Sequence, residues 1–328
     1  MITKNIEVPT GNVCIMEGEH GNLEFLSIGD YGKNANIKAD FLGITRELNG
    51  VPNGEIMPLS ERWVITISTQ YGCSMNCKFC DVPKVGAGYN ATTADMVNQI
   101  KEAIGLHPEI KHTKRLNIHY ARMGEPTWNP SVLTSAMALR NISDQLLAGS
   151  LVHPVVSTMM PKNNPRLLDF VYTWLNIKNN VFDGSAGLQL SINSTDEAQR
   201  EDMFSGNAMT LIDISKMFAD MQKPKGRKYA LNIALADDYI VDARHLARLF
   251  NPDYFMVKIT PLHNTSSCKS NDIKTTGGYS SFVPYQDVEQ RLKAVGFDVL
   301  VFIPSADEEE GLITCGNAIL SGSIPKTK

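Results

Sequence analysis

Short apolar runs alternate with helical periodicity along this 328-residue chain from Trp63 onward. Strands that alternate with helices predict βα units and a parallel sheet. The series is expected to form an α/β fold, a partial (β/α)6 TIM-like barrel, in which chemistry lies where strands end and βα loops begin. Strands are expected at 63–68, 116–121, 152–157, 187–192, 230–235 and 255–260, and helices at 93–106, 130–148, 165–175, 209–221 and 243–249.

The chain is expected to divide into three parts. Residues 1–60 are rich in Gly and Asn with short apolar alternations, which predicts a small β-rich extension. The barrel is assigned to residues 61–270. Residues 271–328 are expected to add a helix near 285–294, a strand near 298–303 and a segment that folds back over the barrel mouth.

Composition restricts the classes of protein that fit. Hydrophobic residues make up 43% of the chain, enough for a large core, and the net charge is −4. This charge argues against a surface given over entirely to nucleic acid, although a local basic patch is compatible with it. Apolar runs fall short of the roughly 18 residues of a membrane span, and the first residues lack the apolar centre of a signal peptide. A cytoplasmic protein without membrane contact, and a monomer, is expected.

Three cysteines fall within eight residues directly after the first strand of the series. Cys73, Cys77 and Cys80 are spaced C-x3-C-x2-C. Three thiolates on one loop can converge on one inorganic site, and a four-iron cluster ordinarily takes four cysteines. Three therefore leave one iron open to another ligand. Zinc is the rival, although structural zinc sites favour four closed ligands; three unligated thiols are the remaining alternative.

The spacing, with Phe79 before the last cysteine, resembles the signature of the radical S-adenosylmethionine (SAM) enzymes. The resemblance implies a four-iron four-sulfur (4Fe-4S) cluster on Cys73, Cys77 and Cys80 whose open iron chelates SAM. Reductive cleavage of SAM then gives a 5′-deoxyadenosyl radical. An electron donor of flavodoxin or ferredoxin type is implied as a partner.

Further motifs follow the later strands in the order that the resemblance implies. Gly124-Glu125 looks like the family's Gly-Glu motif, in which the carboxylate accepts hydrogen bonds from the SAM ammonium and Gly permits close backbone approach. Ser157 resembles a SAM-contacting serine. The remaining implied SAM contacts are Ser191 and Asn193 after the fourth strand and, on the loop after the sixth, His263 or Asn264.

Gln70-Tyr-Gly-Cys73, Met123-Gly-Glu-Pro126 and Thr314-Cys315-Gly316 occur in the same order as in the ribosomal-RNA adenine methyl synthases, which methylate carbon 2 or carbon 8 of an adenine. The resemblance runs from about Glu55 to the C-terminus. It implies an RNA substrate, rRNA or tRNA, and identifies Cys315 with the cysteine that carries the methyl group. Glu55 is nearest to the glutamate that takes a proton from the base adduct, although it is two residues out of register.

Two features depart from that family. Thr66 stands where the family has a second cysteine that resolves the protein–RNA adduct, so Cys268 or Cys14 would have to replace it. The helical RNA-binding domain of the bacterial members is replaced here by about sixty residues that predict strands. A radical SAM reaction on a small molecule, nucleotide or peptide therefore stays open, as does a metal-binding interaction protein.

Two residues beside the Gly-Glu motif are candidates for substrate contact. Arg122 is placed to meet a phosphate or the SAM carboxylate, and Trp128 to stack on a base or to pack the loop. The densest basic runs, at 111–115 and 223–228, precede strands. Barrel geometry puts them at the face away from the chemistry, which favours solvated loops over RNA contacts.

Overall fold

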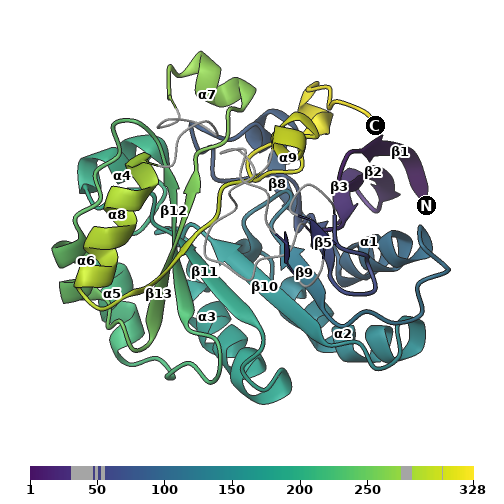
Figure 1. Ribbon diagram of the computed structural model, residues 1–328, viewed down its shortest axis with the longest axis horizontal. Coiled ribbons are helices and arrows are strands. Elements are labelled where there is room, and N and C mark those ends of the chain that lie inside the picture. The colour runs from purple at the N-terminus through teal and green to yellow at the C-terminus, as the bar shows by residue number, and fades with distance from the viewer. Residues whose placement is uncertain (31–46, 49–50, 53–55, 275–282, 305) are drawn as a thin grey trace.

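A computed structural model describes residues 1–30, 47–48, 51–52, 56–274, 283–304 and 306–328. Its centre is a ten-stranded sheet with the order β1-β2-β3-β6-β9-β10-β11-β12-β13-β14 (Figure 1). These strands are β1 (Ile2–Val8), β2 (Gly11–Gly18), β3 (Gly21–Ile28), β6 (Trp63–Ile67), β9 (Leu116–Tyr120), β10 (Val152–Thr158), β11 (Gly187–Ser191), β12 (Tyr229–Leu235), β13 (Phe255–Pro261) and β14 (Asp298–Val301). Two small hairpins pair β4 (Glu47–Leu48) with β5 (Val51–Pro52) and β7 (Gln70–Gly72) with β8 (Ala87–Asn90).

The sheet is parallel from β6 through β14 and antiparallel at its N-terminal edge. β3 joins the parallel part by pairing antiparallel with β6, which places Leu26 opposite Thr66. The first three strands therefore extend the barrel sheet itself. The α/β architecture with a β-rich N-terminal addition is as predicted.

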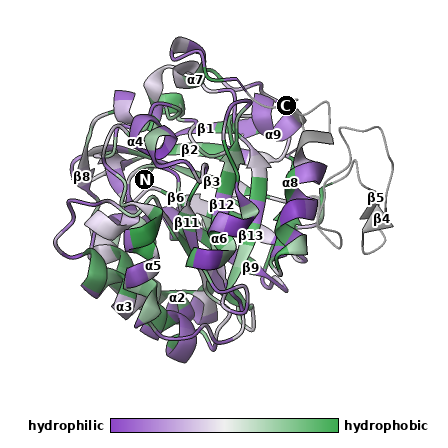
Figure 2. Ribbon diagram, turned by 90° about the vertical axis from the view of Figure 1, so that its left-hand side faces the viewer, coloured by the Kyte–Doolittle hydropathy of each residue, from purple (hydrophilic) through white to green (hydrophobic). Residues whose placement is uncertain are grey.

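Helices cover the outer face of the parallel strands (Figure 1). They are α1 (Thr93–Gly105), α2 (Ser131–Leu146), α3 (Leu167–Asn176), α4 (Glu197–Met203), α5 (Leu211–Ala219), α6 (Ala243–Leu249) and α8 (Val283–Ala294). The short helices α7 (Ser266–Ser270) and α9 (Ala306–Glu310) lie apart from this layer, near the top of the view in Figure 1. Single turns follow at η2 (Val82–Lys84), η3 (Pro126–Trp128), the π-helical η4 (Ile177–Val181) and η5 (Ile319–Ser321). Hydrophobic residues gather on the strands and the helices packed on them, whereas α9 is hydrophilic (Figure 2). In the described part of the chain, no helix is long and apolar enough to span a membrane.

Alternation along the strands separates the core from the barrel interior. In β6, Trp63, Ile65 and Ile67 are fully buried against the helices, whereas Val64 and Thr66 between them are partly exposed. β12 repeats this pattern along its whole length. Because successive side chains of a strand point to opposite faces, the second set faces the barrel interior.

Each strand and each long helix expected from the sequence is present, with ends that differ by a few residues. The β7–β8 hairpin and the short helices α4, α7 and α9 were not predicted. The sequence does not predict the hairpin because Gly72, Gly86 and Gly88 interrupt the alternation of apolar and polar residues that indicates a strand. The glycines permit close approach of the two strands: a Cβ at Gly72 would lie 2.1 Å from the Gly86 carbonyl oxygen. The three domain boundaries stay a prediction.

Candidate active site

The three clustered cysteines lie on the loop that follows β7. The Cys73 amide donates to Gly86 O over 3.1 Å, and the Cys80 amide to Cys77 O over 3.1 Å. Asn76 takes a left-handed φ of 52°, which lets the loop turn back on itself. The loop thus returns all three thiols to one region at the carboxyl ends of the strands.

The three thiols lie close enough to act on one another electrostatically. Burial raises the pKa of Cys73 to about 12, and Glu125 and Cys315 add to the shift. Burial, followed by repulsion from Cys80 and Cys73, raises the pKa of Cys77 well above its usual range. Thiolates in such a place need positive charge from a bound group, as a metal centre supplies.

Gly124 and Glu125 lie where β9 ends. Gly124 has a φ of +95°, and a Cβ there would lie 2.6 Å from Gln70 Cβ, so the position requires glycine. The Glu125 side chain is buried and accepts hydrogen bonds from Thr127 N, Thr127 Oγ1 and Met159 N, at 3.1, 2.8 and 3.0 Å. Its pKa is raised because burial outweighs these bonds. The carboxylate is held in one orientation at the expected strand end.

The barrel interior contains a cavity of about 230 Å³. Its lining includes two of the expected SAM contacts, Ser157 and Ser191, together with His263 and Cys315. Thr66 lines the same cavity, so the position of the missing resolving cysteine faces the compartment of Cys315. Polar side chains from successive strands complete the wall: His119, Gln189, Asn232, Lys258 and Thr260.

Cys315 is exposed, while its neighbours Thr314 and Gly316 are buried. The segment is therefore anchored on both sides of a thiol that is presented to the cavity. Burial by surrounding atoms raises the pKa of Cys315, and the charges of Lys258 and Arg122 oppose that shift. Cys315 also contributes to the electrostatic environment of Cys73 and Cys80, so all four cysteines share one region.

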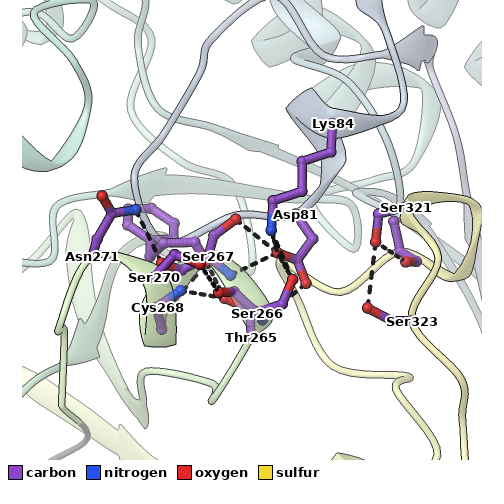
Figure 3. Close-up of polar contacts among 12 residues, drawn as sticks. Asp81, Lys84, Thr265, Ser266, Ser267, Cys268, Ser270, Asn271, Ser321 and Ser323 are labelled. Atoms are coloured by element: carbon purple, nitrogen blue, oxygen red, sulfur yellow. Dashed lines mark hydrogen bonds and ion pairs between the residues drawn. The ribbon is translucent and has the colours of Figure 1, made fainter.

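Asp81, directly after the last clustered cysteine, connects three loops. Its fully buried carboxylate accepts from Ser266 N, Ser266 Oγ, Ser267 N and Ser267 Oγ at 2.7–3.1 Å, and from Lys84 Nζ at 2.8 Å (Figure 3). Its amide donates to Gly316 O over 2.8 Å. The cysteine loop, the start of α7 and the Cys315 segment are thereby fixed to one another.

The two candidates on the loop after β13 occupy different places, and which of them contacts SAM stays a prediction. His263 is buried, lines the cavity and lies 3.2 Å from Glu309 Oε2 through Nδ1. Asn264 is exposed and outside the lining; its amide donates to Glu309 Oε1 over 2.8 Å. Glu309 also accepts from Thr314 Oγ1 at 3.0 Å, which joins this loop to the Cys315 segment.

Asn193 is buried outside that lining. It takes a left-handed φ of 59°, and its Oδ1 accepts from Ala234 N at 3.0 Å. This bond ties the end of β11 to β12. Its role as a SAM contact stays a prediction.

The two candidate replacement thiols occupy different places. Cys268 is buried in α7, and its Sγ lies 3.6 Å from Phe79 O, on the cysteine loop. Cys14 is buried in β2 and contacts Asn5 Oδ1 at 3.3 Å. Burial raises the pKa of Cys14 to about 12. Cys268 is thus the thiol packed against the site.

Three further expectations have different outcomes. Glu55 lies outside the described residues.

Arg122 lines the cavity. Its guanidinium donates to the buried Glu24 carboxylate, with Nε to Oε1 at 2.7 Å, and to Leu312 O at 2.9 Å. Its guanidinium thus has protein partners, and its contact with a phosphate or with the SAM carboxylate stays a prediction. Trp128 packs against the apolar cluster around Met75 and Met159.

Sequence reasoning missed Glu24, Asp81 and Glu309. A glutamate within the apolar run Leu23–Leu26 was a signal, because a charge inside a buried strand needs a partner. The sequence also indicates the polar lining of the barrel cavity, because polar residues alternate with apolar ones along the strands, as at Asn232, Lys258 and Thr260.

Comparisons with known proteins agree with this arrangement. No protein-family model matches the chain. It is 32% identical over 135 residues to the dual-specificity RNA methyltransferase RlmN of Campylobacter lari, covering 40% of this chain and 36% of that protein. A probable RlmN of Heliobacterium modesticaldum is 26% identical over 203 residues, or 58% of this chain and 48% of the other. The chain thus spans between about a fifth and a half of the length of the curated relatives it matches.

A solved structure resembles the fold over nearly the whole chain. The crystal structure of a radical SAM methyltransferase from Sphaerobacter thermophilus has a TM-score of 0.65 at 18% identity, covering 97% of this chain and 80% of that one. At this identity the likeness shows the fold. The chain is thus similar in part of its sequence to proteins named RNA methyltransferases, and similar in fold to this solved structure.

Proposed function

We propose that this chain is a radical SAM enzyme that holds a 4Fe-4S cluster on Cys73, Cys77 and Cys80, and that it methylates an adenine in RNA through a methylated Cys315. The observation that carries the proposal is the exposure of the Cys315 thiol to the barrel cavity beside the three-cysteine loop. The relatives named RNA methyltransferases support the reaction class.

The donor set suits such a cluster. Three thiols that act on one another electrostatically lie on one loop. A four-iron cluster ordinarily takes four cysteines, so three leave one iron open to SAM. A structural zinc site would ordinarily need a fourth closed ligand.

When bound, the cluster and SAM supply an activated methyl group and a reductively generated carbon radical. The chain's own residues orient them. Glu125 offers a fixed carboxylate to the SAM ammonium, and Ser157 and Ser191 offer hydroxyls from adjacent strands. His263, held by Glu309, closes the wall near Cys315. Desolvation inside the cavity strengthens each of these contacts.

Cys315 is proposed to act first as a nucleophile toward a SAM methyl group. Its Sγ–carbon bond forms as the sulfonium–methyl bond breaks, S-adenosylhomocysteine leaves, and the thiol proton passes to solvent or a nearby base. Lys258 and Arg122 favour the thiolate that this attack requires. Carbon 2 of adenine is not nucleophilic, so a methyl group carried on cysteine offers a route that direct transfer does not.

The test is mass spectrometry of anaerobically reconstituted protein incubated with methyl-labelled SAM. The proposal expects a labelled gain of one methylene mass on the Cys315 peptide, absent in Cys315→Ala. It also expects 5′-deoxyadenosine from both proteins once reductant is added. Methylated RNA product formed by Cys315→Ala would contradict the route through Cys315.

A second candidate is a radical SAM reaction on a small molecule, nucleotide or peptide. It is favoured by Thr66, whose hydroxyl lines the cavity where the RNA-modifying family has a thiol. 5′-Deoxyadenosine formation without any label on Cys315 would select this candidate.

A further inference from the structure

Three arginines and one histidine lie at the amino ends of parallel strands β6, β9, β10 and β12, opposite the carboxyl ends that carry the candidate active site. Arg62 precedes β6 and Arg115 precedes β9; the Trp63 amide donates to Arg115 O over 2.9 Å, so the two arginines are neighbours across the sheet. His153 of β10 pairs in register with Asn117 of β9. Arg227 precedes β12.

Two of these side chains converge on one atom. Arg227 Nη1 lies 3.3 Å and His153 Nδ1 lies 3.4 Å from Ser185 O. A Cβ at Gly187 would lie 3.2 Å from Arg227 Nη1, so the guanidinium occupies space that a larger residue at that position would take. Arg115 Nε donates to Asn117 Oδ1 at 3.0 Å, beside His153. The four residues form one group, here called the floor cations.

The floor cations have few anions to balance them. Arg62 pairs with Asp30 at 3.4 Å. Among the described residues, Arg115, His153 and Arg227 have no carboxylate within ion-pair distance. Lys178, close by, is fully buried and bound by two carbonyl oxygens, Lys225 O at 2.5 Å and Gly184 O at 3.3 Å. Positive charge therefore accumulates at this end of the barrel.

The titration of these groups reflects that accumulation. Burial, followed by repulsion from Arg227 and Arg62, lowers the pKa of Arg115 to about 10. Burial, followed by repulsion from Arg115, lowers the pKa of His153 to about 4. Like charges held together at a partly desolvated site are stabilised by an anion bound between them.

Space for an anion exists beside this group. A cavity of about 470 Å³ has His153, Ser185 and Arg140 in its lining, and the other three floor cations lie outside that lining. Ser143 also lines it, and this buried hydroxyl has no hydrogen-bond partner among the described residues. The two carboxylates of the lining are Asp144 and Asp183, of which Asp183 pairs with Lys225. Arg227 is exposed, so a ligand can arrive from solvent without crossing the active site.

We propose that the floor cations bind a phosphate-bearing anion between Arg115, His153 and Arg227. Planar guanidinium groups donate paired hydrogen bonds to phosphoryl oxygens, and a neutral imidazole gains a proton when an anion approaches. The site is separate from the candidate active site and does not depend on the proposed reaction. Two sources share the required chemistry: a free phosphate compound and the phosphodiester backbone of RNA.

Calorimetric titration of the whole protein with inorganic pyrophosphate at fixed ionic strength tests the site. Saturable binding is expected, weakened about tenfold or more in Arg227→Met and Arg115→Met. Arg248→Met, which removes an exposed cation on α6, is the matched control and should bind as the wild type does. Because Arg227 is exposed, its variant keeps the test valid even if Arg115→Met fails to fold.

Nuclear magnetic resonance of the His153 ring supplies a second measurement. A bound anion favours the charged imidazole, so pyrophosphate should raise the pKa of His153 toward its ordinary range against the repulsion of Arg62, Arg115 and Arg227. If a short oligoribonucleotide competes with pyrophosphate, the source of the anion is the RNA backbone. If it does not compete, the source is a free phosphate compound. Non-saturable binding, or equal binding in Arg227→Met and the wild type, would overturn the proposal.

Discussion

The amide of Asp81 donates to the carbonyl oxygen of Gly316 across 2.8 Å. This bond joins the residue after the last clustered cysteine to the residue after Cys315, although 235 positions separate them in the sequence (316 − 81). The Asp81 carboxylate at the same time holds the start of α7. Asp81, which is not a cysteine, therefore helps to fix the distance between the clustered thiols and Cys315.

Replacement of Asp81 by Asn should lower the free energy of unfolding by about 2 kcal/mol, because a buried, charge-assisted acceptor is lost. Denaturant unfolding measures this. Asp242→Asn is the control: the Asp242 side chain caps α6 by accepting from His245 N at 3.0 Å, within its own helix. Asn caps a helix about as well as Asp, so the control should change stability by a few tenths of a kcal/mol. Equal losses in both variants would show that Asp81 acts only as a cap.

The effect of Asp81→Asn on the free energy of unfolding should also depend on pH. Burial alone would raise the pKa of Asp81, but hydrogen bonds from Lys84, Ser267 and Ser266 outweigh it and lower the pKa to about 2. A carboxyl with a depressed folded-state pKa contributes stability above its unfolded pKa of about 3.9 and loses it as pH falls toward 2. The difference in unfolding free energy between wild type and Asp81→Asn should therefore shrink from pH 5 to pH 2. A constant difference would contradict a charged Asp81.

Glu24 and Arg122 form an ion pair that is fully enclosed by protein. Glu24 is inaccessible to solvent and also accepts from Ile319 N at 3.2 Å and Leu320 N at 3.1 Å. Glu24→Gln leaves a buried guanidinium without its counter-charge, which should cost about 3–5 kcal/mol. Glu61→Gln breaks the solvent-exposed pair with Lys114 and should cost under about 1 kcal/mol. Chemical denaturation compares the two, and similar losses would refute the buried pair's role.

Glu125→Gln should weaken SAM binding by about tenfold to a hundredfold while the cluster absorption stays unchanged, because a neutral amide replaces the acceptor for an ammonium. The raised pKa of Glu125 adds a pH signature. Wild-type affinity should be complete above that pKa and fall as pH drops through it, at a higher pH than for an ordinary glutamate. Equilibrium dialysis with SAM measures both. Glu201→Gln, at an exposed position paired with Lys162, should bind SAM normally.

Cys268→Ser should slow release of the methylated RNA if the route through Cys315 operates, since a second thiol is needed to free Cys315 from the adduct. Cys268 contacts the cysteine loop at Phe79 O, whereas Cys14 lies in β2 beside Asn5. A protein–RNA adduct should therefore accumulate in Cys268→Ser and not in Cys14→Ser, as gel electrophoresis of labelled RNA would reveal. Accumulation only in Cys14→Ser would reverse the assignment.

The parallel strands and long helices could be predicted from the sequence because local periodicity defines them. Gly124 could be predicted too, since a glycine beside a buried carboxylate at a strand end indicates close backbone approach, and its φ is +95°. Both signals are confined to a few consecutive residues.

The contacts that bring distant loops together could not be predicted. Asp81 finds its partners Ser266 and Ser267 about two hundred residues later, and Glu24 finds Arg122 and Ile319 in two other parts of the chain. Nothing in the local pattern around a lone acidic residue specifies such a partner. Arg122 is an example: its neighbours in sequence suggest a ligand contact, but nothing near it in sequence indicates its partner Glu24 in β3.

The position of Glu24 also has a consequence for the order in which the protein matures on the ribosome. Chains emerge N-terminus first, at about 5–20 residues per second. The strand that carries Glu24 is made well before the amides of Ile319 and Leu320 that complete its coordination, which lie 295 and 296 positions later. The cysteine loop therefore emerges before the Cys315 segment, and the two can meet only after every strand of the barrel has been made.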